Sequence, residues 1–210
     1  MLRILIVDDH PIVRKGLRQI VAETPVMAIV DEASNGHEAL NKVWENDYDV
    51  VLLDITMPGI SGVEILKELK SIRPNLAVLV LSIHPERQYA VRVLRAGASG
   101  YLTKDSAPEE LIQAIHKVSL GGRYISSSLG ESLVLDLGSN IGKPLHETLS
   151  DREYQVMLMI TSGKTVKEVA EQLSLSVKTV STHRSRLLKK MKMNSNVELV
   201  RYAIQNHLVD

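Results

Sequence analysis

Two apolar runs of this 210-residue chain end in carboxylates. Asp8 and Asp9 directly follow ILIV (4–7), and Asp54 directly follows VVLL (50–53). An ionised carboxylate at the edge of an apolar core is costly to desolvate, and adjacent acids repel each other. A bound cation, or protonation of one acid, would remove this conflict. These three acids are therefore the first candidates for a chemical site.

The elements that must position these acids alternate in type from residue 3 to about residue 120. The short apolar runs, typical of buried strands, are ILIV (4–7), MAIVDEA (27–33), VVLL (50–53), AVLVLS (77–82) and GYLT (100–103). Between them, apolar residues recur at spacings of three and four, as in amphipathic helices. Five such units predict an α/β domain with a parallel sheet covered by helices on both faces.

The carboxyl ends of parallel strands meet at one edge of the sheet, where such domains bind ligands. Asp8 and Asp9 follow the first strand and Asp54 ends the third, so this edge should bring all three together. Ser82 and Lys104 follow the fourth and fifth strands and should reach the same edge.

The last part of the chain has a helical pattern only. Ser150 precedes DREYQVMLMIT as a typical N-cap, and Gly163 follows that helix. The helix TVKEVAEQL, the turn SLS and a basic helix over 177–192 predict a helix-turn-helix motif, and VELVRYAIQNH predicts a fourth helix. GSNIGKP is typical of a flexible connector, and 127–137 has the pattern of a short helix. The expected parts are residues 1–120, a linker with that helix over 121–146, and residues 147–210.

Composition limits the classes of function. The absence of cysteine excludes disulfides, thiol nucleophiles and Cys-based zinc sites. The chain opens without a signal-peptide or transmembrane pattern, so we expect a cytoplasmic protein with no membrane partner. Residues 1–120 contain 13 Lys+Arg and 16 Asp+Glu, whereas residues 121–210 contain 12 and 9. Residues 177–192 contain six basic residues and no acid, a pattern typical of nucleic-acid binding.

With these residues placed, the chain resembles two-component response regulators of the NarL/FixJ group, in which a receiver domain precedes a LuxR-type DNA-binding domain. The resemblance covers nearly the whole chain. It rests on VDDHP, DITMPGISG, Ser82, AGASGYLTKD and LSDREYQVM…SGKTVKEVAEQLSLSVKTVSTHRSRLLKKM. It implies a flavodoxin-like, five-stranded receiver and an all-α, four-helix C-terminal domain.

The resemblance assigns Asp54 as the phosphoacceptor for a sensor histidine kinase. Asp9 would ligate Mg²⁺ directly, Asp8 largely through water, and the backbone carbonyl of Thr56 would complete the protein ligands. The chemistry agrees, because Mg²⁺ prefers hard oxygen ligands and neutralises charge during phosphoryl transfer. Solvated acids that merely end strands are the alternative for any one of these positions.

Three further residues have roles by resemblance. Lys104 would contact a phosphoryl oxygen. Ser82 and Tyr101 match a switch pair, in which the hydroxyl moves to the phosphoryl group and the ring rotates inward; without the family context, plain core packing suits Tyr101 better. For His10 we expect a structural or tuning role, and His84 is a candidate modulator of dephosphorylation.

Written as a helix, 177–192 has two faces. The apolar face, expected to pack on the domain, consists of Val177, Val180, Leu187, Leu188 and Met191. The candidate DNA contacts are Lys178, Thr179, Ser181, Thr182, His183, Arg184, Ser185, Arg186 and Lys189. Several family members have Lys in place of Ser181 and Ser185, so the operator sequence cannot be taken from relatives. The sequence does not rank Arg184 against Arg186, and a solvated basic face is the alternative for the charges alone.

We therefore expect a phosphorylation-controlled transcription regulator that forms a homodimer on phosphorylation or DNA binding. Double-stranded promoter DNA is the expected target, and RNA polymerase is a further candidate partner. The last helix, near Val197 to Ile204, suits a dimer contact or plain core packing. Beyond its own phosphoryl transfer and dephosphorylation we expect no enzyme activity. The alternatives are a phosphorylation-independent regulator with a dimerising receiver, and an Mg²⁺-dependent Asp-nucleophile phosphohydrolase, although Thr56 stands where that class usually has an acid.

Overall fold

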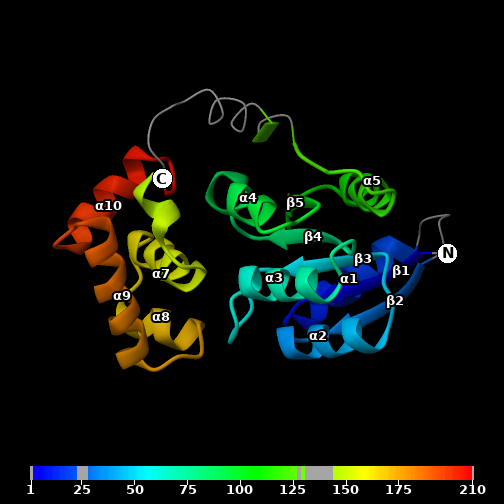
Figure 1. The fold of residues 1–210 in the computed structure, drawn as a ribbon, viewed down its shortest axis with the longest axis horizontal. Coiled ribbons are helices and arrows are strands. Elements are labelled where there is room, and N and C mark those ends of the chain that lie inside the picture. Colours follow the sequence, from blue (N-terminus) through cyan, green and yellow to red (C-terminus); the bar gives the residue numbers. More distant parts are fainter. Residues whose placement is uncertain (1, 23–27, 127–128, 131–143, 210) are drawn as a thin grey trace. The chain divides into compact units, whose positions relative to one another are not determined.

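The computed structural model of this protein describes residues 2–22, 28–126, 129–130 and 144–209. The chain divides into two compact units, residues 1–134 and residues 135–210, whose elements are labelled in Figure 1. Among the described residues, no helix is both long and apolar enough to cross a membrane.

One parallel sheet forms the centre of the N-terminal unit. Its strands are β1 (Leu2–Val7), β2 (Ala28–Ala33), β3 (Val50–Asp54), β4 (Ala77–Ser82) and β5 (Gly100–Thr103). All neighbouring pairs are parallel, and the order across the sheet is β2-β1-β3-β4-β5, the flavodoxin-like order. The predicted fold class is confirmed. Asp54 is the last residue of β3, as predicted.

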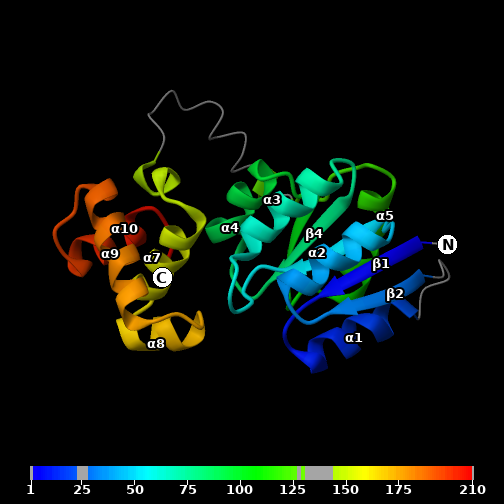
Figure 2. The ribbon, with the colours of Figure 1, turned by 60° about the horizontal axis from the view of Figure 1, so that its bottom comes forward.

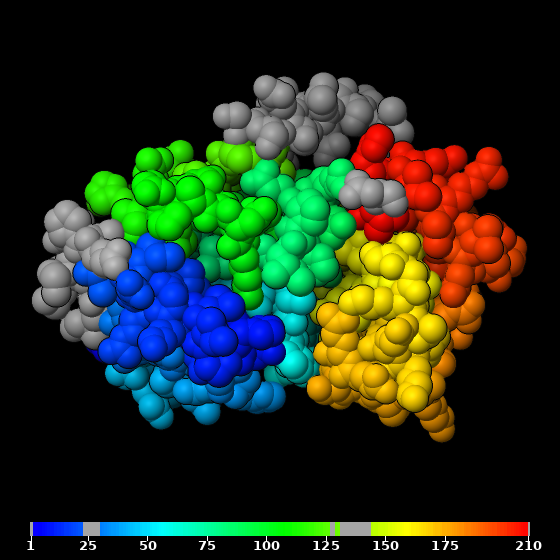
Figure 3. All heavy atoms as spheres, turned by 180° about the vertical axis from the view of Figure 1, so that it is seen from behind, coloured from blue at the N-terminus to red at the C-terminus, as the bar shows by residue number. Residues whose placement is uncertain are grey.

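Five helices cover both faces of this sheet. They are α1 (Pro11–Ala22), α2 (Gly36–Glu45), α3 (Gly62–Ile72), α4 (Glu86–Arg95) and α5 (Pro108–Ser119). α1 and α5 contact each other on one face, and the other three lie on the opposite face (Figure 2). Seen from behind, the dark blue residues of α1 and the green residues of α5 lie side by side (Figure 3).

Strand side chains alternate between the two faces. Ile4, Leu52 and Leu79 pack with Leu111 and Ile115 of α5 in one buried cluster. The residues that alternate with them are also buried, among them Leu5, Val51 and Val80. Burial on both faces explains why these strands are continuous apolar runs rather than alternating ones.

The described residues of the C-terminal unit form helices and no strand, as predicted. A short 3₁₀ helix precedes four helices: η1 (Leu145–Thr148), α7 (Asp151–Thr161), α8 (Val166–Gln172), α9 (Val177–Met191) and α10 (Asn196–Gln205). Side-chain oxygens of Ser150, Thr165, Ser176 and Ser195 cap the four α-helices by accepting backbone N–H groups. α9 contacts α7 and α8, which places the expected helix-turn-helix in the α8–α9 pair.

The residues that directly follow α5 contact the N-terminal unit. The Tyr124 N–H donates to the carbonyl of Ser99 at 2.8 Å, and the Tyr124 hydroxyl donates to Glu110 of α5 at 2.9 Å. These bonds hold Tyr124 against β5 and α5. The short helix predicted over 127–137 lies almost entirely outside the described residues.

Candidate functional site

The ends of β1 and β3 bring two of the predicted acids together. Val7 pairs with Leu53, so Asp8 and Asp54 follow at the same level of neighbouring strands. Both are buried, with 1% and 2% of their surface exposed. Lys104, which follows β5, donates from Nζ to Oδ2 of Asp8 and to Oδ2 of Asp54 at 2.6 Å each. One ammonium group therefore bridges two buried carboxylates.

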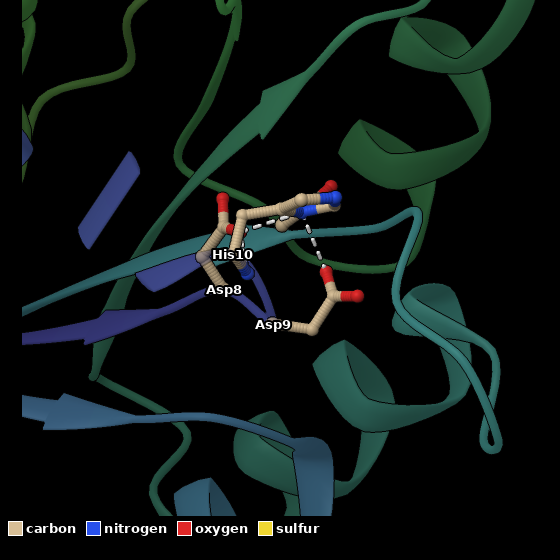
Figure 4. A group of neighbouring side chains, drawn as sticks. Asp8, Asp9 and His10 are labelled. Carbon is tan, nitrogen blue, oxygen red and sulfur yellow. Dashed lines mark hydrogen bonds and ion pairs between the residues drawn. The ribbon is translucent and has the colours of Figure 1, made fainter. Parts of the chain in front are cut away.

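Figure 4 shows Asp8, Asp9 and His10 at the end of β1. Oδ1 of Asp8 accepts the His10 N–H at 2.8 Å and lies 3.3 Å from His10 Nδ1. Nδ1 is also 3.0 Å from Oδ1 of Asp9, yet this buried oxygen accepts no hydrogen bond from any described residue. A buried carboxylate oxygen without a donor is costly, and a cation would satisfy it.

The charges of the site also fit a divalent cation. One ligand atom from each of Asp8, Asp9, His10 and Asp54 can be chosen so that all lie within 4.8 Å of one another. The carboxylates of Asp8, Asp9 and Asp54 and the Lys104 ammonium together carry a formal charge of −2. Mg²⁺ is typically bound through one or two carboxylates and keeps several waters, so the acidic donors present fit this ion.

Burial and charge act in opposite directions on the paired groups. Burial raises the pKa of Asp54, and the Lys104 ammonium together with the Thr56 N–H, 2.8 Å from Asp54 Oδ1, opposes that rise. Burial would lower the pKa of Lys104, but Asp54 and Asp8 outweigh this effect and raise it. The ammonium is therefore held charged beside the acids.

Close packing fixes the loop that follows Asp54. A Cβ at Gly62 would lie 2.3 Å from Cα of Ile55, so only glycine permits α3 to start at this distance from the loop. Gly59 has φ +87°, in the left-handed region that favours glycine. The loop thereby keeps the backbone of Thr56 beside Asp54, where its carbonyl is the predicted metal ligand.

The two predicted switch residues are both fully buried. Ser82 Oγ accepts the N–H of His84 at 3.1 Å, and the Tyr101 hydroxyl donates to the carbonyl of His84 at 2.7 Å. The Lys104 N–H donates to the Ser82 carbonyl at 2.8 Å. Ser82 is thus linked both to the loop after β4 and to the backbone of Lys104.

α9 packs one face on the C-terminal unit. Val180, Leu187 and Met191 of the predicted apolar face are buried. Leu188 is half-buried. Val177 is 51% exposed, so its predicted burial is wrong: it is the first residue of α9, and the packed face begins one turn later at Val180.

The opposite face of α9 is exposed. Its exposed candidate contacts are Lys178, Ser181, Thr182, Ser185, Arg186 and Lys189. The hydroxyls of Thr182 and Ser185 donate to the carbonyls of Lys178 at 2.9 Å and Ser181 at 3.0 Å, one turn earlier. These side chains are short, so the N-terminal part of this face permits close approach to another surface.

The remaining candidates differ in exposure. Thr179 and His183 are half-buried. Nε of Arg184 donates to Oδ1 of Asn196 at 2.7 Å, which ties Arg184 to the start of α10. Arg186 is exposed, so the structure separates two arginines that the sequence does not rank.

Three supporting residues were not predicted from the sequence. Glu153 accepts Lys190 Nζ of α9 at 2.6 Å, Asn196 accepts Arg184, and Arg14 donates to the Asp8 carbonyl at 2.7 Å. Each acts through a partner distant in the chain or through backbone, so no local pattern marks it. Only Glu153 has a local sequence signal, because it is the acid of the capping box that begins at Ser150.

Two family models match this chain. The response regulator receiver domain matches residues 4–116, and the luxR family of bacterial regulatory proteins matches residues 147–203. Response regulator UvrY of Escherichia coli (strain K12) is 39% identical over 209 residues, which cover 99% of this chain and 96% of UvrY. Response regulator GacA of Pseudomonas viridiflava is 38% identical over 211 residues, which cover 100% of this chain and 99% of GacA.

Solved structures agree with these matches. RcsB from Salmonella enterica serovar Typhimurium, bound to promoter rprA in the presence of phosphomimetic BeF₃⁻, is 25% identical with a TM-score of 0.64, over 96% of this chain and 97% of that one. A LuxR-family response regulator from Aurantimonas sp. SI85-9A1 is 35% identical with a TM-score of 0.61, over 66% of this chain and 99% of that one. This chain therefore belongs to the two-component response regulators of the NarL/FixJ group, which join a receiver domain to a LuxR-type helix-turn-helix domain.

Proposed function

We propose that this response regulator is a transcription regulator in which Asp54 accepts a phosphoryl group from a sensor histidine kinase, and that this modification changes dimerisation and promoter binding. The observation that carries the proposal is the ammonium of Lys104, 2.6 Å from both Asp54 and Asp8. It places a positive charge where the oxygens of a phosphoryl group on Asp54 would lie. Positioning and charge stabilisation are the main requirements of phosphoryl transfer.

Each residue of the site has a separate role in the phosphoryl transfer. A carboxylate oxygen of Asp54 attacks the phosphorus of the kinase's phosphohistidine; a P–O bond forms, the P–N bond breaks, and the leaving imidazole takes up a proton. Lys104 donates to a phosphoryl oxygen. Asp8, Asp9, Asp54 and the carbonyl of Thr56 would hold Mg²⁺, which, when bound, neutralises charge on the transferred group.

Ser82 and Tyr101 can transmit the effect of phosphorylation because both hydrogen-bond to the same residue, His84. If Ser82 Oγ turns to a phosphoryl oxygen, it gives up the N–H of His84. The loop before α4 is then held at His84 by Tyr101 from the other side. A small movement at Asp54 can therefore be converted into a change of this loop, which is the type of bistable element that phosphorylation acts on.

The DNA-binding proposal rests on α9. Its exposed cations Lys178, Arg186 and Lys189 can neutralise phosphates, while its short hydroxyl side chains can approach base edges in the major groove. On α10, Val197 and Ile204 are 77% and 49% exposed, which supports the proposed dimer contact there. RNA polymerase as a partner, a cytoplasmic location and a linker up to residue 146 belong to the same proposal.

Response regulators are not enzymes in the ordinary sense, which removes the phosphohydrolase alternative. The other alternative, a regulator that ignores phosphorylation, is tested together with the proposal. Wild type and Asp54→Asn are treated with acetyl phosphate and Mg²⁺, with EDTA as a parallel control. Intact mass at neutral pH and binding to a promoter-fragment library are measured on the same samples.

We expect wild type alone, and only with Mg²⁺, to gain one phosphoryl group and to bind selected fragments more tightly. Equal DNA binding with and without the phosphoryl group would favour the phosphorylation-independent regulator. Labelling of Asp54→Asn to the same extent as wild type would remove Asp54 as the acceptor.

A further inference from the structure

The guanidinium group of Arg14 connects three elements beside the acidic site. Arg14 lies in the second turn of α1, and 14% of its side chain is exposed. Nη1 donates to the backbone carbonyl of Asp8 at 2.7 Å, and Nε donates to Oε2 of Glu32 in β2 at 3.1 Å. One planar group therefore joins α1, the end of β1 and the neighbouring strand β2.

The carbonyl that Arg14 holds belongs to the peptide between Asp8 and Asp9. The other groups of Asp8 are fixed independently, since its N–H donates to Ala33 at 3.1 Å and its carboxylate accepts Lys104. Oδ1 of Asp9, in contrast, is buried and accepts no hydrogen bond from any described residue. This oxygen lies 3.0 Å from Nδ1 of His10, whose own side chain is 66% exposed. The backbone that precedes Asp9 therefore contributes to the direction of its carboxylate.

We propose that Arg14 is a positioning residue for the Mg²⁺ site, which orients Asp9 by fixing the plane of the Asp8–Asp9 peptide. This inference rests on the proposed function. Glu32 pairs with Arg14 and offsets its charge, so the role is geometric rather than electrostatic. Groups that orient metal ligands typically contribute about 10- to 100-fold to metal affinity.

The chain offers a matched control on the same helix. Arg18 follows Arg14 by one turn and also pairs with Glu32, from Nη1 to Oε1 at 3.4 Å. Its side chain is 62% exposed, and it makes no hydrogen bond to Asp8 among the described residues. Removing Arg18 therefore removes the same charge from the same helix and leaves the hydrogen bond from Arg14 to the Asp8 carbonyl intact.

The test is calorimetric titration of Mg²⁺ into the metal-free full chain. We compare wild type with Arg14→Gln, Arg14→Lys, Arg18→Gln and Asp9→Asn, and we record metal-free thermal unfolding of each. Arg14→Gln should raise the Kd for Mg²⁺ by about 10-fold or more, and Arg18→Gln should leave it unchanged. Arg14→Lys should also weaken binding, because a single ammonium cannot replace the two-directional donation of the planar fork.

A second readout separates positioning from general damage to the receiver. In labelling by acetyl phosphate, the half-saturating Mg²⁺ concentration of Arg14→Gln should rise by the same factor as its Kd. The rate at saturating Mg²⁺ should change less, since the bound ion restores the direction of Asp9. A merely structural role of Arg14 would instead lower the unfolding temperature and leave the Mg²⁺ dependence unchanged.

Equal Kd values for Arg14→Gln and Arg18→Gln would overturn the role of Arg14. If Arg14→Gln does not fold, Arg14→Lys and Glu32→Gln decide: both should weaken Mg²⁺ binding, and unchanged Kd values in both would overturn it. A wild type that does not bind Mg²⁺ would overturn the proposed metal site and this inference with it. Binding that Asp9→Asn abolishes and Arg14→Gln leaves intact would overturn the inference alone.

Discussion

Ser82 and Tyr101 hydrogen-bond to opposite ends of one residue, Ser82 Oγ to the N–H of His84 at 3.1 Å and the Tyr101 hydroxyl to its carbonyl at 2.7 Å. Both side chains are fully buried and come from the neighbouring strands β4 and β5. These two bonds fix the loop between β4 and α4 at His84. A change in one of these bonds can shift His84, on which the other bond also depends.

Ser82→Ala and Tyr101→Phe should each weaken the communication between phosphorylation and DNA binding. Each removes one hydrogen bond and retains most of the packing. If wild type binds its promoter more tightly after phosphorylation, we expect each variant to lose about 5-fold or more of that gain, the lower range of allosteric coupling. Because both act through His84, the double variant should lose little more than the larger single loss. Binding isotherms with and without acetyl phosphate measure this.

Tyr48→Phe is the matched control for the tyrosine variant. Its hydroxyl donates to Asp31 of β2 at 2.8 Å, so the same atom is removed elsewhere in the receiver. The phosphorylation-dependent gain should be unchanged. Strictly additive losses in the Ser82 and Tyr101 variants would show that the two residues act independently.

Gly62→Ala should destabilise the receiver, whereas Gly16→Ala should not. A Cβ at Gly62 would lie 2.3 Å from Cα of Ile55, whereas nothing lies within 4 Å of a Cβ at Gly16 in α1. We expect Gly62→Ala to cost about 1–3 kcal/mol by overpacking. Gly16→Ala should stabilise the helix by about 0.5–1 kcal/mol. Hydrogen exchange of the β1 and β3 amides measures the change in the free energy of unfolding for both variants.

The same pair tests the role of the loop after Asp54. The backbone of Ile55 must move to admit the new methyl group, which displaces Thr56 from the acid. Acetyl phosphate labelling should therefore slow in Gly62→Ala and stay at the wild-type rate in Gly16→Ala. Equal rates would show that the loop tolerates the shift.

The meeting of the site residues at one edge of the sheet could be predicted because the pattern of apolar residues marks the strands. Apolar runs mark the strands, parallel strands end at one edge, and so Asp8, Asp54 and Lys104 were expected to meet. The partners of Arg14 and Arg184 could not be predicted from the sequence. Glu32 and Asn196 lie 18 and 12 residues away, and only the packed positions of β2 and α10 decide that they meet these arginines.

Val177 shows a related limit of helical periodicity. The spacing from Val177 to Met191 is correct for one face of α9, yet Val177 is 51% exposed. Periodicity gives the direction of a side chain on its own helix. It does not show how far the neighbouring helices extend along that face.

Arg186→Ala and Arg184→Ala should affect DNA binding in different ways. Arg186 is exposed, so its loss should weaken binding and reduce the slope of log affinity against log salt by about 0.9 if it contacts one phosphate. Arg184 donates to Asn196, so its loss should destabilise the C-terminal unit by about 1 kcal/mol. Its salt slope should remain that of wild type. Filter binding over a salt series separates the two, and a reduced slope for Arg184→Ala would place it on a phosphate instead.

Glu153→Gln should weaken the attachment of α9 to α7 in a pH-dependent way. Burial would raise the pKa of Glu153, but Lys190 and the capping contacts with Ser150 outweigh it and hold the pKa below its ordinary value of 4.5. The carboxylate accepts Lys190 Nζ at 2.6 Å and the Ser150 N–H at 2.8 Å. A carboxyl with a lowered pKa stabilises the folded state above pH 4.5, and this stabilisation is lost as pH falls through the folded pKa.

We therefore expect Glu153→Gln to be less stable than wild type by about 1 kcal/mol at pH 7. The deficit should stay constant down to about pH 5 and shrink below 4.5, where wild-type Glu153 becomes protonated. Hydrogen exchange of the α9 amides, corrected for the intrinsic pH dependence, measures it. Glu171→Gln, which removes an exposed acid 4.0 Å from Lys167 on α8, is the control and should change α9 little at any pH. A deficit that persists unchanged below pH 4 would mean that packing around the side chain, rather than its charge, holds α9 in place.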